Sequence, residues 1–227
     1  ADLGMVAEGA CVGGFWNAGQ DCTAVTRVYV HKNHSTELVH KMVKVAKQFQ
    51  LGNPLNKNTD MGPLISEQQR DRVESYIRLA VNEGAKIACG GQRPKGKTYA
   101  KGWFLEPTIL TNVNPRSRVC REEIFGPVIV VLPYTTREEA LAKANDSIYG
   151  LAASVYGSNI SDCISAAAGL HFGTVWINEH GILTSETPHG GFKQSGFGKD
   201  LSLYALDEYT RIKHVYIDLT KQQRRSW

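Results

Sequence analysis

Cys22 ends a short polar segment that could expose a nucleophile. The segment from Phe15 to Thr23 reads Phe-Trp-Asn-Ala-Gly-Gln-Asp-Cys-Thr, and the strand-like residues 25–31 follow it. A thiol on such a turn can meet a substrate while flanking structure holds its backbone, and the thiolate is the form that attacks. No cation is adjacent in sequence, and the neighbouring Asp21 would raise the thiol pKa. By itself the segment therefore also fits an inert, buried cysteine.

Two acidic residues precede a turn that leads into the most apolar stretch of the chain. Glu122 and Glu123 are followed by Ile-Phe-Gly-Pro and then by residues 128–132. A carboxylate at the entrance of a buried strand is well placed to accept hydrogen bonds from sugar hydroxyls. The same pattern also fits a solvated acidic turn.

A glycine-rich segment from Thr187 to Lys199 contains His189. Its spacing superficially suggests a phosphate-binding loop, but the residue order differs from GxxxxGK[ST] and no clear strand precedes it. The sequence identifies no partner for His189. A loop of this length and composition is expected to be functional or to form an interface.

The composition is that of an ordinary folded protein. Among 227 residues, 42% are hydrophobic and 21% are charged, and no apolar run approaches the length of a membrane span. The net charge of +4 comes largely from the basic tail 220–227, and no stripe of Lys and Arg suggests a nucleic-acid site. Five widely spaced cysteines form no Cys-x-x-Cys pair, so we expect no metal site and a reducing compartment. We therefore expect a cytoplasmic protein that binds neither nucleic acid nor membrane.

Hydrophobic spacing alternates along the chain between helical and strand-like patterns. Helices are predicted over residues 35–50, 66–84, 137–145 and 162–169, with Ser35 or Thr36, Ser66 and Thr136 as N-terminal caps. Strands are predicted over residues 85–89, 103–110, 128–132, 151–156, 173–178 and 210–219. The run 128–132 is apolar on both faces, which is typical of a parallel sheet, so the pattern indicates an α/β fold.

Three segments together resemble signatures of the aldehyde dehydrogenase superfamily. Residues 15–22 resemble the nucleophile signature, an aromatic pair followed by N-x-G-Q-x-C, and residues 123–128 resemble the cofactor signature E-x-F-G-P-V. Residues 188–198 resemble the late loop P-x-G-G-x-K-x-S-G-x-G, and residues 103–108 and 176–178 match as well. The order and spacing agree along nearly the whole chain, which makes the resemblance specific.

The resemblance implies a three-layer α/β/α catalytic (C-terminal) domain with a mostly parallel sheet over residues 1–209. It also implies an oligomerisation strand over 210–219, paired with another subunit of a homodimer or homotetramer, and a basic tail over 220–227. Family chains are considerably longer. Their N-terminal half carries the nucleotide-binding domain, a catalytic glutamate and an oxyanion-hole asparagine, and we expect these to be absent from this chain.

In complete enzymes of this kind, Cys22 would attack an aldehyde as a thiolate, hydride would pass to NAD or NADP, and water would release the acid from a thioester. Glu123 would bind the nicotinamide ribose, and Phe125 would contact the nicotinamide. Gln69 would either reach the same ribose or complete the cap begun by Ser66.

The expected substrate is a cationic aldehyde. Asp21 and the run Pro188-His189-Gly190-Gly191 make the chain most similar to γ-aminobutyraldehyde and betaine aldehyde dehydrogenases. The Asp21 carboxylate would favour cations, and Trp16 would give either a cation–π contact or plain core packing. The remaining expected substrate-pocket residues are Thr23, Ile182, Leu183 and His189.

Two other functions remain open at this point. One is a truncated or structural homologue that keeps the fold without catalysis. The other is a thiol hydrolase without a cofactor, which would need a His or Glu base near Cys22, and none is close in sequence. We also expect the chain alone to fold without oxidising aldehydes, and Cys22 to react with iodoacetamide like an ordinary thiol.

Overall fold

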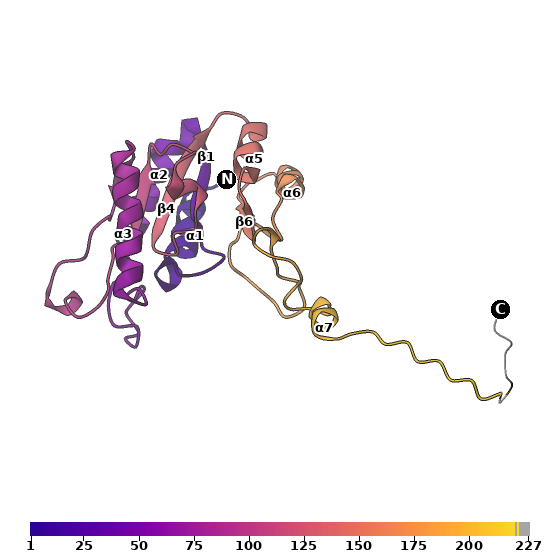
Figure 1. Ribbon diagram of the computed structural model, residues 1–227. Coiled ribbons are helices and arrows are strands. Elements are labelled where there is room, and N and C mark those ends of the chain that lie inside the picture. Colours follow the sequence, from indigo (N-terminus) through magenta and orange to yellow (C-terminus); the bar gives the residue numbers. More distant parts are fainter. Residues whose placement is uncertain (221, 223–227) are drawn as a thin grey trace.

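Strands and helices alternate through most of the chain, as an α/β fold requires. The structure is a computed structural model that describes residues 1–220 and residue 222 (Figure 1). Its helices are α1 (Leu3–Phe15), α2 (Ser35–Ala46), α3 (Glu67–Asn82), α4 (Arg118–Arg121), α5 (Arg137–Asn145), α6 (Ile160–Gly169) and α7 (Tyr204–Tyr209). Its strands are β1 (Arg27–His31), β2 (Lys86–Cys89), β3 (Thr108–Thr111), β4 (Val128–Tyr134), β5 (Tyr149–Gly150), β6 (Ala152–Val155), β7 (Thr174–Ile177) and β8 (Phe192–Lys193).

A four-stranded sheet in the order β1-β4-β3-β2 forms the centre of the fold. Strands β1, β4 and β3 run parallel, with Val28 opposite Val131, and β2 is antiparallel to β3. Residues 128–132 of β4 are all buried, because both faces of this central strand are covered. The predicted buried parallel strand is therefore confirmed, and the observed strand continues through Pro133 to Tyr134.

Helices cover both faces of this sheet. Helices α1 and α2 pack against each other and against β4, and α3 lies on the opposite side of the sheet (Figure 1). Helix α3 begins where sequence predicts, because the Ser66 hydroxyl accepts a hydrogen bond from the backbone N–H of Gln69 at 3.1 Å. Thr136 caps α5 in the same way through the N–H of Glu139. The arrangement is the layered α/β fold that the sequence indicates.

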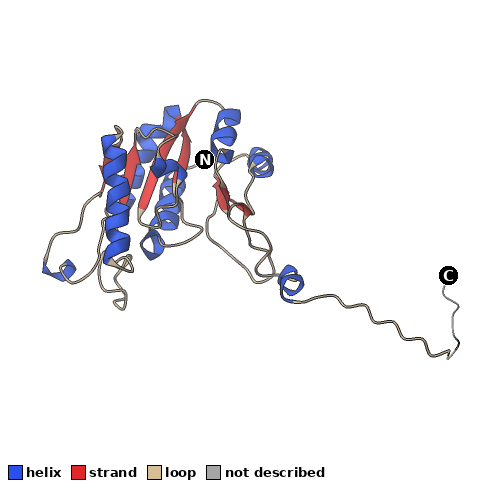
Figure 2. Cartoon of the chain, viewed as in Figure 1, coloured by secondary structure: helices blue, strands red, loops and turns tan. Residues whose placement is uncertain are grey.

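A second, smaller parallel sheet is formed by β6 and β7 (Figure 2). Strands β5 and β8 pair antiparallel beside it. Strands β1 and β6 belong to different sheets. Residues of both strands line a cavity of about 820 Å³. The four-stranded sheet and the β6–β7 sheet are consequently joined by side chains and loops rather than by a shared ladder.

Two sequence predictions in the first half are wrong at the element ends. Neither Ser35 nor Thr36 is the cap of α2, since the short 3₁₀ turn Lys32–His34 leads directly into the helix and His34 takes the cap position without a side-chain bond. This helix ends at Ala46 rather than near residue 50. The expected strand 103–110 is confined to β3, because Pro107 has no N–H for a ladder bond.

The expected strand over residues 210–219 is not formed in the single chain, which holds no second subunit for it to pair with. These residues form no strand or helix, and Figure 1 shows them running away from the folded body. Ile212 is fully exposed, and Val215, Ile217 and Leu219 are exposed as well. Alternating apolar residues form a strand only against a second edge, and within the described residues this segment pairs with none. Most of the basic tail 220–227 lies outside the described residues.

Candidate active site

The nucleophile segment leaves α1 through a run of left-handed backbone. Asn17, Ala18 and Gly19 have φ values of 50°, 56° and 67°. The Asn17 side chain stabilises this unusual run by donating to the carbonyl of Gln20 at 2.9 Å. The Gln20 side chain in turn accepts from the backbone N–H of Ile65 at 3.1 Å. The side-chain amide groups of Asn17 and Gln20 therefore stabilise the loop and attach it to the segment before α3.

Gly19 brings the nucleophile loop against the Glu-x-Phe-Gly-Pro loop. A Cβ atom at Gly19 would overlap the carbonyl group of Gly126 and lie 2.7 Å from the nitrogen of Pro127. Only glycine combines the left-handed φ with so close a backbone approach. The two motifs, which are far apart in sequence, thereby become neighbours.

Cys22 lies on a tight turn that Asp21 holds from inside. The backbone N–H of Ala24 donates to the carbonyl of Asp21 at 3.1 Å and closes the turn. The carboxylate oxygen Oδ1 of Asp21 accepts from the N–H of Thr23 at 2.8 Å and from its hydroxyl at 2.9 Å. Cys22 projects from this turn as an exposed residue. Asp21 and Thr23, expected as substrate-pocket residues, thus also shape the turn that carries the thiol.

The surroundings of Cys22 disfavour the thiolate. Burial raises its pKa, the charge and hydrogen bond of Asp21 raise it further, and Glu123 adds to the effect. Burial raises the pKa of Cys11 to about 12 and that of Cys120 to about 11, and both thiols are buried. Cys22 is the most exposed of the five cysteines, but its own chain does not activate its thiol.

Replacing Asp21 by asparagine will accelerate alkylation of Cys22 by iodoacetamide several-fold at pH 7.5. Asparagine keeps the Oδ1 acceptor of the turn but removes the negative charge, so the thiol pKa falls and the thiolate fraction rises. Peptide mass spectrometry resolves Cys22 from the other cysteines. Asp21→Ala, which removes the charge and the turn bonds together, is the comparison variant. An Asp21→Asn rate equal to or below that of the wild type would contradict the electrostatic account.

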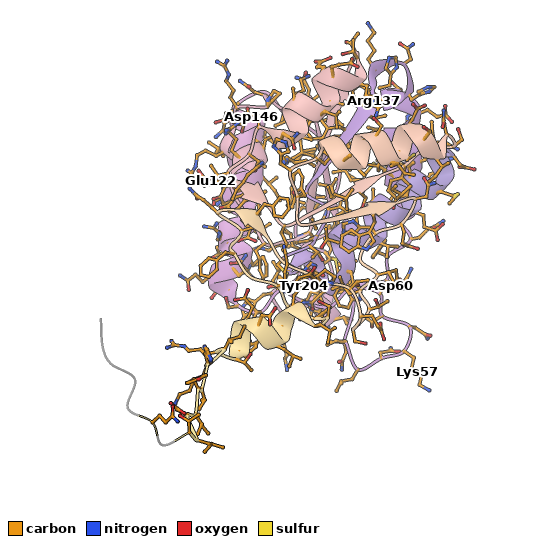
Figure 3. All side chains as sticks on the ribbon, turned by 90° about the vertical axis from the view of Figure 1, so that its right-hand side faces the viewer. Lys57, Asp60, Glu122, Arg137, Asp146 and Tyr204 are labelled. Atoms are coloured by element: carbon orange, nitrogen blue, oxygen red, sulfur yellow. The ribbon has the colours of Figure 1, made fainter. Side chains whose placement is uncertain are left out.

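The two acids before the buried strand have different environments. Arg118 donates two hydrogen bonds to the Glu122 carboxylate at 2.7 and 2.9 Å, and the Tyr76 hydroxyl donates a third at 2.5 Å. These bonds, that of Arg118 above all, lower the pKa of Glu122 to about 2. Figure 3 places Glu122 on the same side of the molecule as Asp146, which pairs with Arg121. Glu122 is therefore a structural ion-pair residue.

The Glu123 carboxylate is free to bind a ligand. In the described chain it has neither a hydrogen-bond nor an ion-pair partner, although its backbone carbonyl accepts from Arg72 at 2.7 Å. Glu123 also lines the cavity that contains Cys22. Of the two candidate acids, Glu123 is the one available for recognition.

Gln69 supports the backbone beside Glu123. Its side-chain Nε2 donates to the carbonyls of Ile124 at 3.0 Å and Phe125 at 2.7 Å. Phe125 has a left-handed φ of 59° and a partly exposed ring. The side chain of Gln69 therefore does not return to Ser66 as a full capping box would require. It fixes the unusual conformation from which Glu123 and Phe125 project.

A cavity of about 330 Å³ brings part of the expected site together. Five of the expected residues line it, namely Cys22, Asp21, Thr23, Glu123 and Phe125. The other expected residues, Gln69, Trp16, Ile182, Leu183 and His189, do not. Sequence reasoning missed several lining residues, including Arg27, Arg121, Tyr149, Phe172 and Ser195. The position of Arg27 shortly after the nucleophile turn is the sequence feature that could have identified it as a site residue.

Three of the expected substrate-pocket residues lie on the surface. Trp16 is 63% exposed, Ile182 is 61% exposed, and Leu183 is also exposed. Trp176 of β7 donates from its indole nitrogen to the carbonyl of Ile182 at 2.8 Å and holds this segment. Trp16 does not pack into the core formed by the described residues.

The late glycine-rich loop packs on itself. His189 Nδ1 lies 2.9 Å from the Thr174 hydroxyl, and its backbone pairs with Asp200. Lys193 and Lys199 donate to backbone carbonyls, those of Asn145 and Gly190, at 3.0 and 3.3 Å. Because both ammonium groups are used within the chain, the loop does not resemble a phosphate-binding site.

The described part of the chain gives no sign of a metal site. Within residues 1–220 and 222, no group of three or more His, Cys, Asp or Glu side chains could hold a metal ion. In the same residues, no helix has the length and apolar character needed to cross a bilayer.

The comparison with protein families agrees with this geometry. The model of the aldehyde dehydrogenase family matches residues 1–215. The chain belongs to the aldehyde dehydrogenase family. The α/β fold with its mostly parallel sheet matches solved structures of the family.

Betaine aldehyde dehydrogenases are among the similar family members. That of Brucella melitensis biotype 2 is 42% identical over 221 residues, which cover 97% of this chain and 45% of that protein. The betaine aldehyde dehydrogenase of Staphylococcus aureus, solved with NAD+ and a BME-modified cysteine, is 39% identical with a TM-score of 0.94, over 98% of this chain and 45% of that one.

An aldehyde dehydrogenase from Bacillus cereus, solved as an NAD+ complex, is 44% identical with a TM-score of 0.91. The match covers 97% of this chain and 44% of that one. This chain thus spans less than half the length of the relatives that it matches.

Proposed function

We propose that the protein containing this chain oxidises an aldehyde to a carboxylic acid with NAD or NADP. The observation that carries the proposal is the placement of exposed Cys22 and unpartnered Glu123 around one cavity. Family membership supports the same reaction.

Cys22 is the proposed nucleophile. Its thiolate sulfur forms a bond to the aldehyde carbon, and the carbonyl oxygen takes the negative charge as an oxyanion, which the Cys22 backbone N–H stabilises. An oxidised nicotinamide, when bound, would supply the acceptor for the hydride that leaves the former aldehyde carbon. Cys22 then holds the product as a thioester, and water releases the acid and restores the thiol. The raised pKa of Cys22 fits a nucleophile that ionises only in the assembled site.

Glu123 and Phe125 are the proposed cofactor-binding residues. A free carboxylate can accept hydrogen bonds from ribose hydroxyls, and a partly exposed aromatic ring can contact a flat heterocycle. Gln69 acts indirectly by holding the carbonyls of residues 124 and 125. Both side chains therefore fit the nicotinamide-ribose end of NAD or NADP.

A cationic aldehyde of the betaine or amino type is the proposed substrate. The betaine aldehyde dehydrogenases among the relatives support this choice. The negative charge of Asp21 remains close to Cys22 although its Oδ1 atom holds the turn. Exposed Trp16 offers an aromatic face for a cation, and Ile182 and Leu183 offer apolar surface.

Glu123→Gln will slow hydride transfer in the full-length protein about tenfold to a hundredfold. Loss of a charged ribose contact lets the nicotinamide leave its reactive position, and small misplacements lower rates steeply. Rapid-mixing measurement of the NADH burst with betaine aldehyde and with γ-aminobutyraldehyde tests both the reaction and the substrate class. Glu138→Gln, an exposed acid on α5, is the control. The 227-residue chain alone should give no NADH, and an unchanged burst in Glu123→Gln would count against the assignment.

Residues 210–219 are the proposed oligomerisation strand of a cytoplasmic homodimer or homotetramer. Their exposed apolar side chains would be covered by pairing with another subunit. The proposed cytoplasmic location is supported by the five cysteines, none of which forms a disulfide.

Ending the full-length protein after Tyr209, which removes this strand, should reduce its mass in light scattering to that of a monomer. An oligomer that persists unchanged would show that other surfaces hold the subunits together.

A further inference from the structure

His180 links the nucleophile turn to the second sheet. Its Nε2 lies 2.8 Å from the carbonyl oxygen of Thr23, the residue after Cys22. Its Nδ1 lies 2.6 Å from the hydroxyl of Ser154 on β6. His180 itself follows β7, so one ring spans from the β6–β7 sheet to the turn that carries the thiol.

The two contacts determine which ring nitrogen carries the proton. A carbonyl oxygen only accepts, so Nε2 must donate to Thr23, and Nδ1 of a neutral ring then accepts from the Ser154 hydroxyl. Burial lowers the pKa of His180, which favours the neutral ring, although its contact with Thr23 and the charges of Asp21 and Glu179 oppose the shift. The Thr23 carbonyl thereby fixes the tautomer, and the bond to Ser154 orients the ring so that its Nε2–H meets Thr23.

The ring is held from several sides. Trp176 of β7 contacts it at a centroid distance of 4.9 Å. Asn178 bonds in both directions with the backbone of Gly157, at 2.8 and 2.9 Å, and so fixes the start of the His180 loop. On the opposite side, a Cβ atom at Gly13 would lie 2.6 Å from the ring carbon Cδ2. His180 therefore occupies a closely fitted position between α1 and the second sheet.

This link matters because β1 and β6 do not pair. In the described residues, the other hydrogen bonds of the turn 21–24 stay within the turn itself. Thr23 lines both the site cavity and the larger cavity between the sheets, so its bond to His180 lies at the boundary between them. Without it, the second sheet has no direct hydrogen bond to the Cys22 turn.

We propose that His180 is a positioning residue that holds the Thr23 carbonyl and thereby keeps the thiol of Cys22 aimed into the site cavity. The inference rests on the proposed function, since it assigns Cys22 as the nucleophile. His180 does not touch the reacting atoms. Its effect on the reaction comes through the orientation of the turn.

Two isosteric replacements separate this hydrogen bond from simple packing. The amide nitrogen of glutamine can occupy the Nε2 position, whereas that of asparagine reaches only the Nδ1 position. On the 227-residue chain, His180→Asn should speed hydrogen exchange of the amides at residues 23–25 about tenfold, and His180→Gln should restore near-wild-type protection. Ser154→Ala, which keeps the ring but releases Nδ1, should give an intermediate rate and remains informative if His180→Asn does not fold.

Kinetics of the full-length protein supply the second readout. His180→Asn should lower kcat about tenfold or more while leaving KM for NAD within twofold, and His180→Gln should recover most of the loss. Unchanged exchange in both His180→Asn and Ser154→Ala, or equal exchange in His180→Asn and His180→Gln, would overturn the proposal. If the wild-type protein oxidises no aldehyde, the proposed function fails, and the exchange measurement still decides whether His180 holds the turn.

Discussion

Replacing Cys22 by alanine in the full-length protein will abolish aldehyde oxidation, with kcat reduced about ten-thousandfold or more. Without the thiol there is no covalent acceptor for the aldehyde, so neither the thiohemiacetal nor the thioester can form. The turn should survive, because its hydrogen bonds come from the backbone and from Asp21 rather than from the sulfur. Binding of NADH, followed by fluorescence, should therefore persist while turnover is lost.

Cys89→Ala is the matched control for this experiment. Cys89 is partly exposed, and burial raises its pKa as it does for Cys22, but it lies on β2 and does not line the site cavity. Its removal should leave turnover nearly unchanged. Retained oxidation in Cys22→Ala would remove the nucleophile assignment. Wild-type thioester hydrolysis without aldehyde oxidation would instead favour the thiol hydrolase considered from the sequence.

The sequence predicts the site best where a motif combines chemistry with backbone geometry. The segment before Cys22 contains the glycine that permits close approach, so its motif carries both the thiol and the means of placing it against residues 126 and 127. The run 128–132 is recognisable as buried because every residue in it is apolar. Local patterns of this kind need no knowledge of distant contacts.

Other site residues have roles that depend on long-range partners. The residue pattern alone does not separate Glu122 from Glu123; the family resemblance selects Glu123, and the contacts of Glu122 with Arg118 and Tyr76, placed by α4 and α3, give the physical difference. Gln69 matches a capping pattern, but its side chain finds the carbonyls of a loop far along the chain. His180 has no local motif at all, since Thr23 and Ser154 come from different elements.

The strand predicted over residues 210–219 shows a different limit. Period-two alternation describes which side chains share a face, but a strand also needs hydrogen bonds from a neighbouring edge. Within the described residues this segment pairs with no other strand, and it remains exposed. The proposed pairing with another subunit would supply that edge.

Gly19→Ala will destabilise the chain by more than about 3 kcal/mol and will displace Cys22 from the site. The left-handed φ of 67° alone costs about 1 kcal/mol for alanine. The added methyl group would also overlap the backbone of Gly126, and backbone cannot move aside as a flexible side chain can. Relief requires the nucleophile loop to separate from the loop of Glu123, which breaks the arrangement around the cavity.

Gly84→Ala separates these two contributions. Gly84 has a φ of 96°, but a Cβ atom there would meet nothing within 4 Å, so only the conformational cost applies. Urea unfolding should therefore show a loss of about 1 kcal/mol for Gly84→Ala and a loss several times larger for Gly19→Ala. Equal losses would mean that the approach of Gly19 to Gly126 does not constrain the site. A larger loss at Gly19, accompanied by altered alkylation of Cys22, links the stability of this contact to the placement of the nucleophile.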